Sequence, residues 1–115
     1  MITKKTINIP IFRLKLKIVV VDDIEEALEI DTNINTEADS LVIDHNNGTA
    51  TVVIASNDMS IIAHECLHIK NIVWNRIGYS PQALNDEVDA YLLDYIMAEV
   101  LKIVEKHTNK TLLKI

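Results

Sequence analysis

The stretch from Ser60 to Lys70 constrains the fold more than any other part of the chain. It reads S-I-I-A-H-E-C-L-H-I-K, which places the pattern H-E-x-x-H among apolar residues at helical spacing. Residues four apart lie one above the other on the same face of an α-helix. His64 and His68 can therefore direct their imidazole nitrogens to a single metal ion. Glu65 would then lie beside that ion, where its carboxylate can take a proton from water.

H-E-x-x-H on a helix is a zinc-binding pattern of metallopeptidases, with two histidine ligands and a glutamate base. Catalytic zinc usually has three protein ligands and an open position for water, so a third ligand must come from elsewhere. Glu87 is the first candidate, because it belongs to the helix that returns after Gly78. By helical rise, His68 lies about 15 Å from the end of its helix, and Glu87 about 9 Å into a helix that begins at Pro81. Asp94, seven residues later on the same face, is the alternative ligand, or an acceptor for a histidine ring N–H.

Three tyrosines are candidates for a further catalytic role. A peptidase benefits from a hydrogen-bond donor directed at the developing oxyanion. Tyr91 and Tyr79 could provide it, with Tyr95 behind them. The alternative for each is ordinary amphipathic packing with the hydroxyl at the surface. Asn71 and Asn75 follow His68 on roughly its face, either as partners of the site or as solvated side chains.

The N-terminal half is predicted to be mostly strand. Residues 6–21 alternate apolar and basic side chains, which indicates a half-buried strand. Pro10 has no N–H to donate, so we expect it at an edge, at a bulge or at the beginning of the strand. Asp22 or Asp23 is expected to cap a short helix that ends at about Ile30. A polar loop over residues 31–39 follows.

A β-hairpin and two long helices are predicted for the rest of the chain. Asn47-Gly48 separates the runs 41–44 and 50–55, and either strand could be the sheet edge, to which an extended substrate can add. The motif helix is expected to begin at a cap within residues 56–58 and to end at about Ile77, before Gly78. The last helix begins at Pro81 after a Ser80 cap, or later after an Asn85 cap, and ends at about His107.

Length and composition limit the class of protein. The chain of 115 residues suits a single domain, 1–115, with one core. Its net charge of −6 is unevenly spread, because residues 21–45 carry nine acids and no lysine or arginine. This disfavours nucleic acid as a partner, and no apolar run is long enough to span a membrane. A single cysteine and the lack of a signal peptide predict a cytoplasmic protein.

The remaining histidines and the cysteine have simpler expectations. His45 lies in the predicted turn and His107 near the end of the last helix, so both are expected to face solvent. Cys66 is offset from the two motif histidines along the helix. We expect it to be a thiol of the core.

Two segments together resemble a known family. Ile62–His68 and Asn85–Ile96 are similar to the small zincin-like metallopeptidases of bacteriophages, which pair H-E-x-x-H with a later N-D-E-x-x-A-Y-L segment. The resemblance covers about residues 56–97. It implies His64 and His68 as ligands of Zn²⁺, Glu65 as base and Glu87 as third ligand. The later segment also resembles the E-x-x-A-x-x-F/Y segment of radiation-response and repressor-cleaving metallopeptidase domains, in which the gap between the motifs is typically longer.

The expected protein is therefore a minimal α+β zincin-like domain. We expect a small sheet containing antiparallel strands, with an N-terminal strand and a hairpin, an H-E-x-x-H helix and a long C-terminal helix. Its expected function is hydrolysis of a peptide bond in a peptide or protein substrate, with Glu65 as base and Tyr91 as oxyanion donor. The alternative is an assembly or virion component that contacts other phage proteins and whose zinc is non-catalytic or absent. A phage-encoded chain would lie in the host cytoplasm or in the virion.

Overall fold

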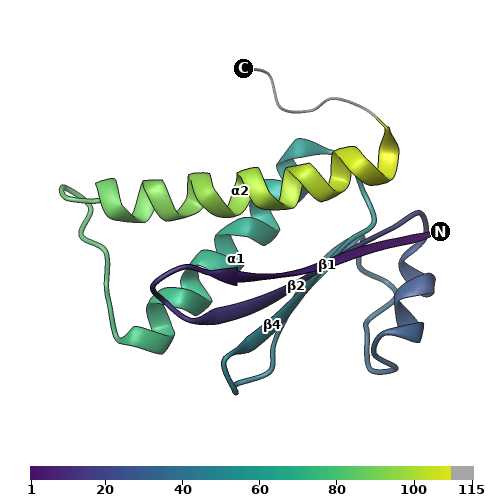
Figure 1. The fold of residues 1–115 in the computed structure, drawn as a ribbon, viewed down its shortest axis with the longest axis horizontal. Helices are drawn as coiled ribbons and strands as arrows, with labels where there is room; N and C mark the ends of the chain where they lie inside the picture. Colours follow the sequence, from purple (N-terminus) through teal and green to yellow (C-terminus); the bar gives the residue numbers. More distant parts are fainter. Residues whose placement is uncertain (110–115) are drawn as a thin grey trace.

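Four strands form one mixed sheet in the order β1-β2-β4-β3. The structure is a computed structural model, and it describes residues 1–109. Its elements are β1 (Ile2–Ile9), β2 (Leu14–Val21), the 3₁₀-helix η1 (Ile24–Glu29), β3 (Ser40–Asp44), β4 (Thr49–Ile54), α1 (Met59–Ile77) and α2 (Glu87–Thr108) (Figure 1). The expected α+β class is confirmed.

The first two strands form a hairpin, where the sequence predicted a single strand over residues 6–21. β1 and β2 pair antiparallel, with Ile9 opposite Leu14 and Ile2 opposite Val21. Pro10 follows the last residue of β1, and its carbonyl accepts a hydrogen bond from the N–H of Phe12. Ile11 and Arg13 adopt φ values of 71° and 56°, and these left-handed conformations reverse the chain. The continuous prediction was wrong because this turn lacks the usual Gly or Asn signal.

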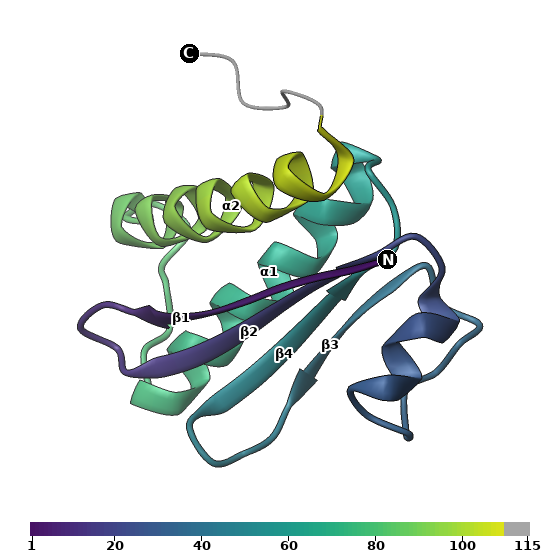
Figure 2. The same ribbon diagram turned by 45° about the vertical axis from the view of Figure 1, so that its right-hand side comes forward.

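The predicted second hairpin is confirmed. β3 pairs antiparallel with β4, which in turn runs parallel to β2 in the interior of the sheet. Asn46 and Gly48 in the connecting turn have φ values of 58° and 89°, which glycine and asparagine tolerate best. β3 therefore has one paired side and lies at the edge of the sheet (Figure 2).

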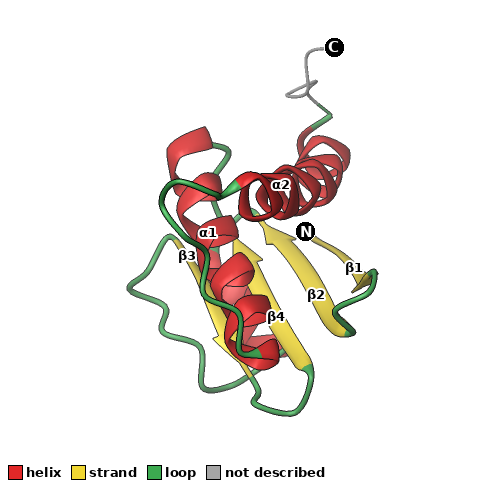
Figure 3. Ribbon diagram, turned by 90° about the vertical axis from the view of Figure 1, so that its left-hand side faces the viewer, coloured by secondary structure: helices red, strands yellow, loops and turns green. Residues whose placement is uncertain are grey.

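Both long helices cover the same face of the sheet. α1 contacts β3 and β4, whereas α2 contacts β1 and β2 (Figure 3). Alternate residues of β2 face these helices, and they share the main core with Ile62, Cys66, Ile69 and Val73 of α1. Intervening residues, including Val19 and Val21, face the opposite side. There they pack with Ile24 and Ala27 of η1 and with Ile34.

The ends of the helices follow their capping residues. Asp58 caps α1 through a 2.9 Å hydrogen bond from the N–H of Ser60, and Gly78 ends it with φ of 71°. η1 begins after Asp23, which is one of the two residues predicted to cap it. Asp23 and Glu26 form a capping box. α2 is the exception: it begins at Glu87 after Asp86, whose side chain makes no capping hydrogen bond. The predicted start at Pro81 was wrong, and the later of the two predicted starts lies closer.

One exposure prediction fails and another holds. His107 was expected to face solvent but is buried. Its two ring nitrogens contact Thr3 Oγ1 at 2.8 Å and Asp22 Oδ1 at 2.7 Å. Cys66 is buried as expected, and burial raises the pKa of its thiol to about 12. In the described part of the chain, neither long helix is apolar over enough of its length to cross a bilayer.

Candidate metal centre

Packing of α1 on the sheet determines where the motif side chains lie. Ile62, Cys66, Ile69 and Val73 form the stripe that faces the sheet, and all four are fully buried. His64 and His68 lie on the outward side of the helix, and both are exposed. Glu65 lies on the flank toward β3, and only 5% of it is exposed. Helical periodicity thus separates two accessible imidazoles from one buried carboxylate.

The two histidines approach each other closely. Their Nε2 atoms are 3.1 Å apart, and the rings meet edge to face with centroids 4.7 Å apart. Two nitrogen ligands of a tetrahedral zinc ion, each about 2.05 Å from the metal, would be about 3.3 Å apart. The pair is therefore spaced as two ligands of one ion would be. The same spacing allows one ring to donate a hydrogen bond to the other when no metal is bound.

Glu65 completes the group. Its Oε1 lies 3.8 Å from Nε2 of His64. Its Oε2 is buried and accepts no hydrogen bond from residues 1–109. Burial raises the pKa of Glu65, and the two nearby histidines oppose that change only in part. A buried carboxylate oxygen without a hydrogen-bond partner destabilises the folded state. It is therefore expected to bind a proton, a water molecule or a metal ion when the protein functions.

Ligand atoms of His64, Glu65 and His68 all lie within 4.8 Å of one another. Within residues 1–109, this is the group of His, Cys, Asp and Glu side chains that could hold a metal ion. Imidazole nitrogens and a carboxylate oxygen are the donors that zinc takes in catalytic sites. His64 and His68 therefore supply two donors of a kind that zinc accepts, and Glu65, the expected base, lies beside them.

Glu87 is not brought into this group. It is the first residue of α2 and is exposed. Two residues later, Asp89 Oδ1 accepts hydrogen bonds of 2.6 Å from Nζ of Lys70 and from Nε1 of Trp74, so Asp89 faces α1. Each helical residue advances by about 100°, so Glu87 lies roughly 200° around α2 from Asp89 and faces away from α1. The third ligand stays a prediction.

The alternative ligand and the proposed oxyanion donor share that outward face of α2. Tyr91 and Asp94 follow Glu87 at the fourth and seventh positions, which lie on one side of a helix. Both are exposed, Tyr91 by 67%. Tyr79 instead packs against Trp74, with ring centroids 4.7 Å apart. In this arrangement none of the three lies in the histidine group.

An ion pair between the buried Lys70 and the partly exposed Asp89 joins the two helices. Lys70 Nζ is held by Asp89 at 2.6 Å and by Asn71 Oδ1 at 3.1 Å. Burial tends to raise the pKa of Asp89, but the hydrogen bonds from Lys70 and Trp74 and the Lys70 charge outweigh it and lower that pKa. Sequence reasoning did not single out this pair. Its signal was a lysine among apolar residues of the motif helix and an aspartate at the beginning of the next helix.

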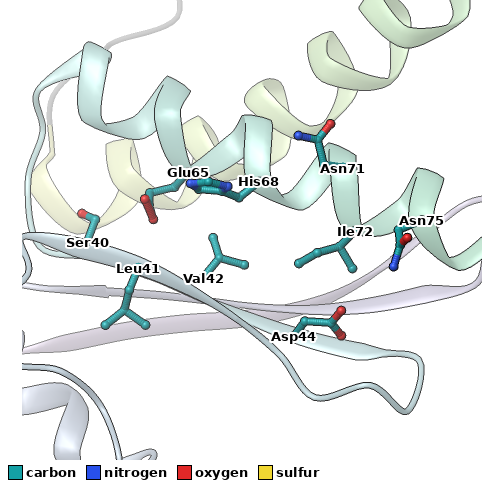
Figure 4. Close-up of a pocket in the computed structure, with 9 residues that line it drawn as sticks. All are labelled: Ser40, Leu41, Val42, Asp44, Glu65, His68, Asn71, Ile72 and Asn75. Carbon is teal, nitrogen blue, oxygen red and sulfur yellow. The ribbon is translucent and has the colours of Figure 1, made fainter. Parts of the chain in front are cut away.

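A pocket of about 480 Å³ adjoins the group of His64, Glu65 and His68, between α1 and the edge strand β3 (Figure 4). Glu65 and His68 lie on its helix side. Ser40, Val42 and Asp44 come from β3, and their alternation places them on the face toward α1. β3, one of the two strands that could have been the sheet edge, therefore lies directly beside Glu65 and His68.

No family model matches the chain, and no curated protein and no solved structure shows significant similarity to it.

Proposed function

We propose that this protein is a zinc-dependent hydrolase that cleaves peptide bonds, built as a small zincin-like domain. The observation that carries the proposal is the group on α1. Two exposed imidazoles have Nε2 atoms 3.1 Å apart, and beside them lies a buried carboxylate, one oxygen of which accepts no hydrogen bond from any of the described residues 1–109. A merely structural helix would gain nothing from leaving that oxygen without a hydrogen bond.

His64 and His68 hold the ion in this proposal. Zinc, when bound, acidifies water and polarises a carbonyl group. Glu65 accepts a proton from the attacking water and then passes it to the leaving amine. In the metal-free protein, burial raises the pKa of Glu65 and brings it nearer the range in which a general base works at neutral pH.

Glu87 is the proposed third ligand, on the strength of the sequence resemblance. It would reach the ion only after a change in the path of residues 78–86 or in the first turn of α2. Tyr91 is the proposed oxyanion donor and lies one helical turn after Glu87 on the same face. Its hydroxyl would approach the reacting carbonyl only if α2 also turned about its axis, which the Asp89 contacts with Lys70 and Trp74 oppose. Asp94 follows on that face as the alternative ligand.

The edge strand supports a peptide as substrate. β3 pairs with β4 on one side, so its other side offers backbone N–H and C=O groups to an added strand. The pocket beside Glu65 lies along this strand. An extended peptide pairing with β3 would pass over the candidate metal centre.

A turnover experiment tests the proposal. Zinc-loaded wild-type protein is expected to cleave members of a quenched-fluorescent peptide library, and chelation is expected to stop cleavage. Glu65→Gln is expected to retain zinc and to lose at least about 100-fold in rate, which is the usual contribution of a general base. Equal turnover by Glu65→Gln would overturn the proposed mechanism. Zinc binding without any turnover would favour the alternative of a zincin-like phage assembly component.

A further inference from the structure

The pocket beside the candidate metal centre has two chemically different ends. Glu65 of α1 and Ser40 of β3 lie at one end, and Asn75 of α1 and Asp44 of β3 lie at the other (Figure 4). From Ser40 to Asp44 the strand rises by about 13 Å. The pocket is therefore a trough that leads from the proposed reaction centre to a carboxylate.

The middle of the trough is apolar. Val42 from β3 and Ile72 from α1 line it, and both also pack against the main core. Their positions are thus fixed by the same packing that holds α1 on the sheet. Such walls favour the hydrocarbon stem of a long side chain.

The far end of the trough carries an available negative charge. Asp44 Oδ1 accepts a 2.9 Å hydrogen bond from the N–H of Asn46. Within residues 1–109, no lysine or arginine forms an ion pair with Asp44. Arg76, near the C-terminus of α1, instead lies over Gly48 and lines a different cavity. Asn75 adds an amide group to this end.

We infer that this trough is a specificity pocket for a lysine or arginine side chain of the substrate. The inference rests on the proposed function, because it places that side chain within a peptide bound along β3. From Val42 to Asp44 the rise is about 7 Å, a length that the stem of lysine or the arm of arginine can span. The stem lies on Val42 and Ile72, and the cationic head meets Asp44 and Asn75.

The net negative charge of the protein acts in the same direction. Nine acids and no lysine or arginine lie between positions 21 and 45, a stretch that includes β3. Most of these acids lie on η1 and its flanks, on the other face of the sheet, so they act on a peptide through the net charge of −6, which favours basic peptides over acidic ones. A glutamate side chain placed in the trough would face Asp44 with like charge.

Binding to zinc-loaded Glu65→Gln protein tests the inference without relying on turnover. The probes are capped hexapeptides in which one position at a time carries Lys, Arg, norleucine or Glu. We expect one position at which Lys and Arg bind about tenfold more tightly than norleucine, as a charge-assisted hydrogen bond would give. Glu at that position should bind more weakly still.

Adding Asp44→Asn to the Glu65→Gln protein should reduce the preference to less than about twofold. The asparagine oxygen can still accept from the N–H of Asn46, so the hairpin turn is preserved. Asp44→Lys should favour Glu at the same position. Glu37→Gln is the matched control, since it removes one charge from the same acidic stretch at an exposed position outside the pocket and should keep the tenfold preference.

The outcomes separate this inference from the proposed function. Lack of peptide binding, equal binding of Lys and norleucine at every position, or a preference that survives Asp44→Asn would each overturn the pocket assignment. A preference that Asp44→Asn abolishes supports it, even if the wild-type protein cleaves no peptide. In that case the proposed hydrolysis fails while the pocket assignment stands.

Discussion

Glu65 is the side chain at which stability and the proposed chemistry conflict. It is buried, and its Oε2 has no hydrogen-bond partner within residues 1–109. Burial raises its pKa, so the ionised form destabilises the folded chain. Groups of this kind occur preferentially at functional sites. The two exposed histidines beside Glu65 support a catalytic role for this destabilising carboxylate.

Replacing Glu65 by Gln should therefore stabilise the metal-free protein in a pH-dependent way. A raised folded-state pKa means that stability is lost as pH rises above the unfolded-chain value of about 4.3. The free energy of unfolding of Glu65→Gln should exceed that of wild type by more at pH 7 than at pH 4.5. Urea unfolding of both metal-free proteins measures this difference. A gap that does not change with pH would contradict the burial argument, and Glu37→Gln controls for the loss of one charge.

Cys66 should behave as an inert thiol of the core. Its pKa of about 12 leaves almost no thiolate at pH 8, and its side chain faces the sheet. We expect no reaction of the native protein with a disulfide reagent within an hour, and complete reaction in denaturant. The absorbance of the released thiol measures both. Rapid reaction of the native protein would show that α1 opens from the sheet or that the thiol lies nearer the surface.

The contact between the two long helices depends on a few polar atoms. Asp89 accepts hydrogen bonds from Lys70 and Trp74, and both donors lie on the side of α1 away from β3. This contact fixes the rotation of α2 about its axis. It also turns Glu87, Tyr91 and Asp94 outward, because they lie on the opposite side of α2 from Asp89.

Asp89→Ala should destabilise the fold by about 3 kcal/mol, because it leaves the buried Lys70 ammonium without its counter-ion. Urea unfolding measures the change. Lys70→Met added to Asp89→Ala should recover part of the loss, since no unpaired charge is then buried. Lys102→Ala, which breaks the more exposed pair with Glu99, is the control and should cost about 0.5 kcal/mol or less. Equal costs for the two pairs would contradict the assigned role of Asp89.

The two ends of the described chain are joined through His107. This residue, near the end of α2, lies between Thr3 of β1 and Asp22, which directly follows β2. The N-terminal amine also contacts Asp22 and Glu26. The last helix is thus tied to the first strand and to the turn before η1.

Asp22→Asn should weaken this connection only where Asp22 is ionised. The hydrogen bond from His107 is the main cause that lowers the pKa of Asp22. A lowered pKa contributes stability above the unfolded-chain value of about 3.9, and that contribution is lost as pH falls through the folded-state value. The variant should be less stable than wild type at pH 6 and equal to it below that lower value. Thermal unfolding across this range measures the difference, and Glu29→Gln is the control at an exposed site of η1.

Much of the fold follows from local signals in the chain. Asn47-Gly48 and Gly78 correctly predicted a turn and a helix end, and the cap of α1 is Asp58, one of the three residues predicted for it. Each of these signals acts on its own neighbours. The hairpin at Pro10–Arg13 was missed, because Ile11 and Arg13 rarely adopt left-handed backbone and their sequence gives no signal for it. The burial of His107 depends on Thr3 and Asp22, which are distant in sequence.

The candidate site likewise has one part that the sequence could predict and one part that it could not. His64, Glu65 and His68 form a local group, so helical periodicity alone brings their ligand atoms together. The position of Glu87 depends on how α2 is rotated, and that rotation follows from the Asp89 contacts with Lys70 and Trp74, which periodicity does not reveal. The role of Asp44 emerges only when the register of β3 beside α1 is known.

The central claim is that His64 and His68 together bind one metal ion. Zinc content of purified protein, measured by mass spectrometry after dialysis against a weak chelator, tests it most directly. We expect about one zinc per chain for wild type and for His45→Ala, which changes an exposed histidine outside the group. His64→Ala and His68→Ala should each reduce zinc to near zero. Absence of stoichiometric zinc from the wild-type protein would contradict the claim. So would retention of zinc by both His64→Ala and His68→Ala.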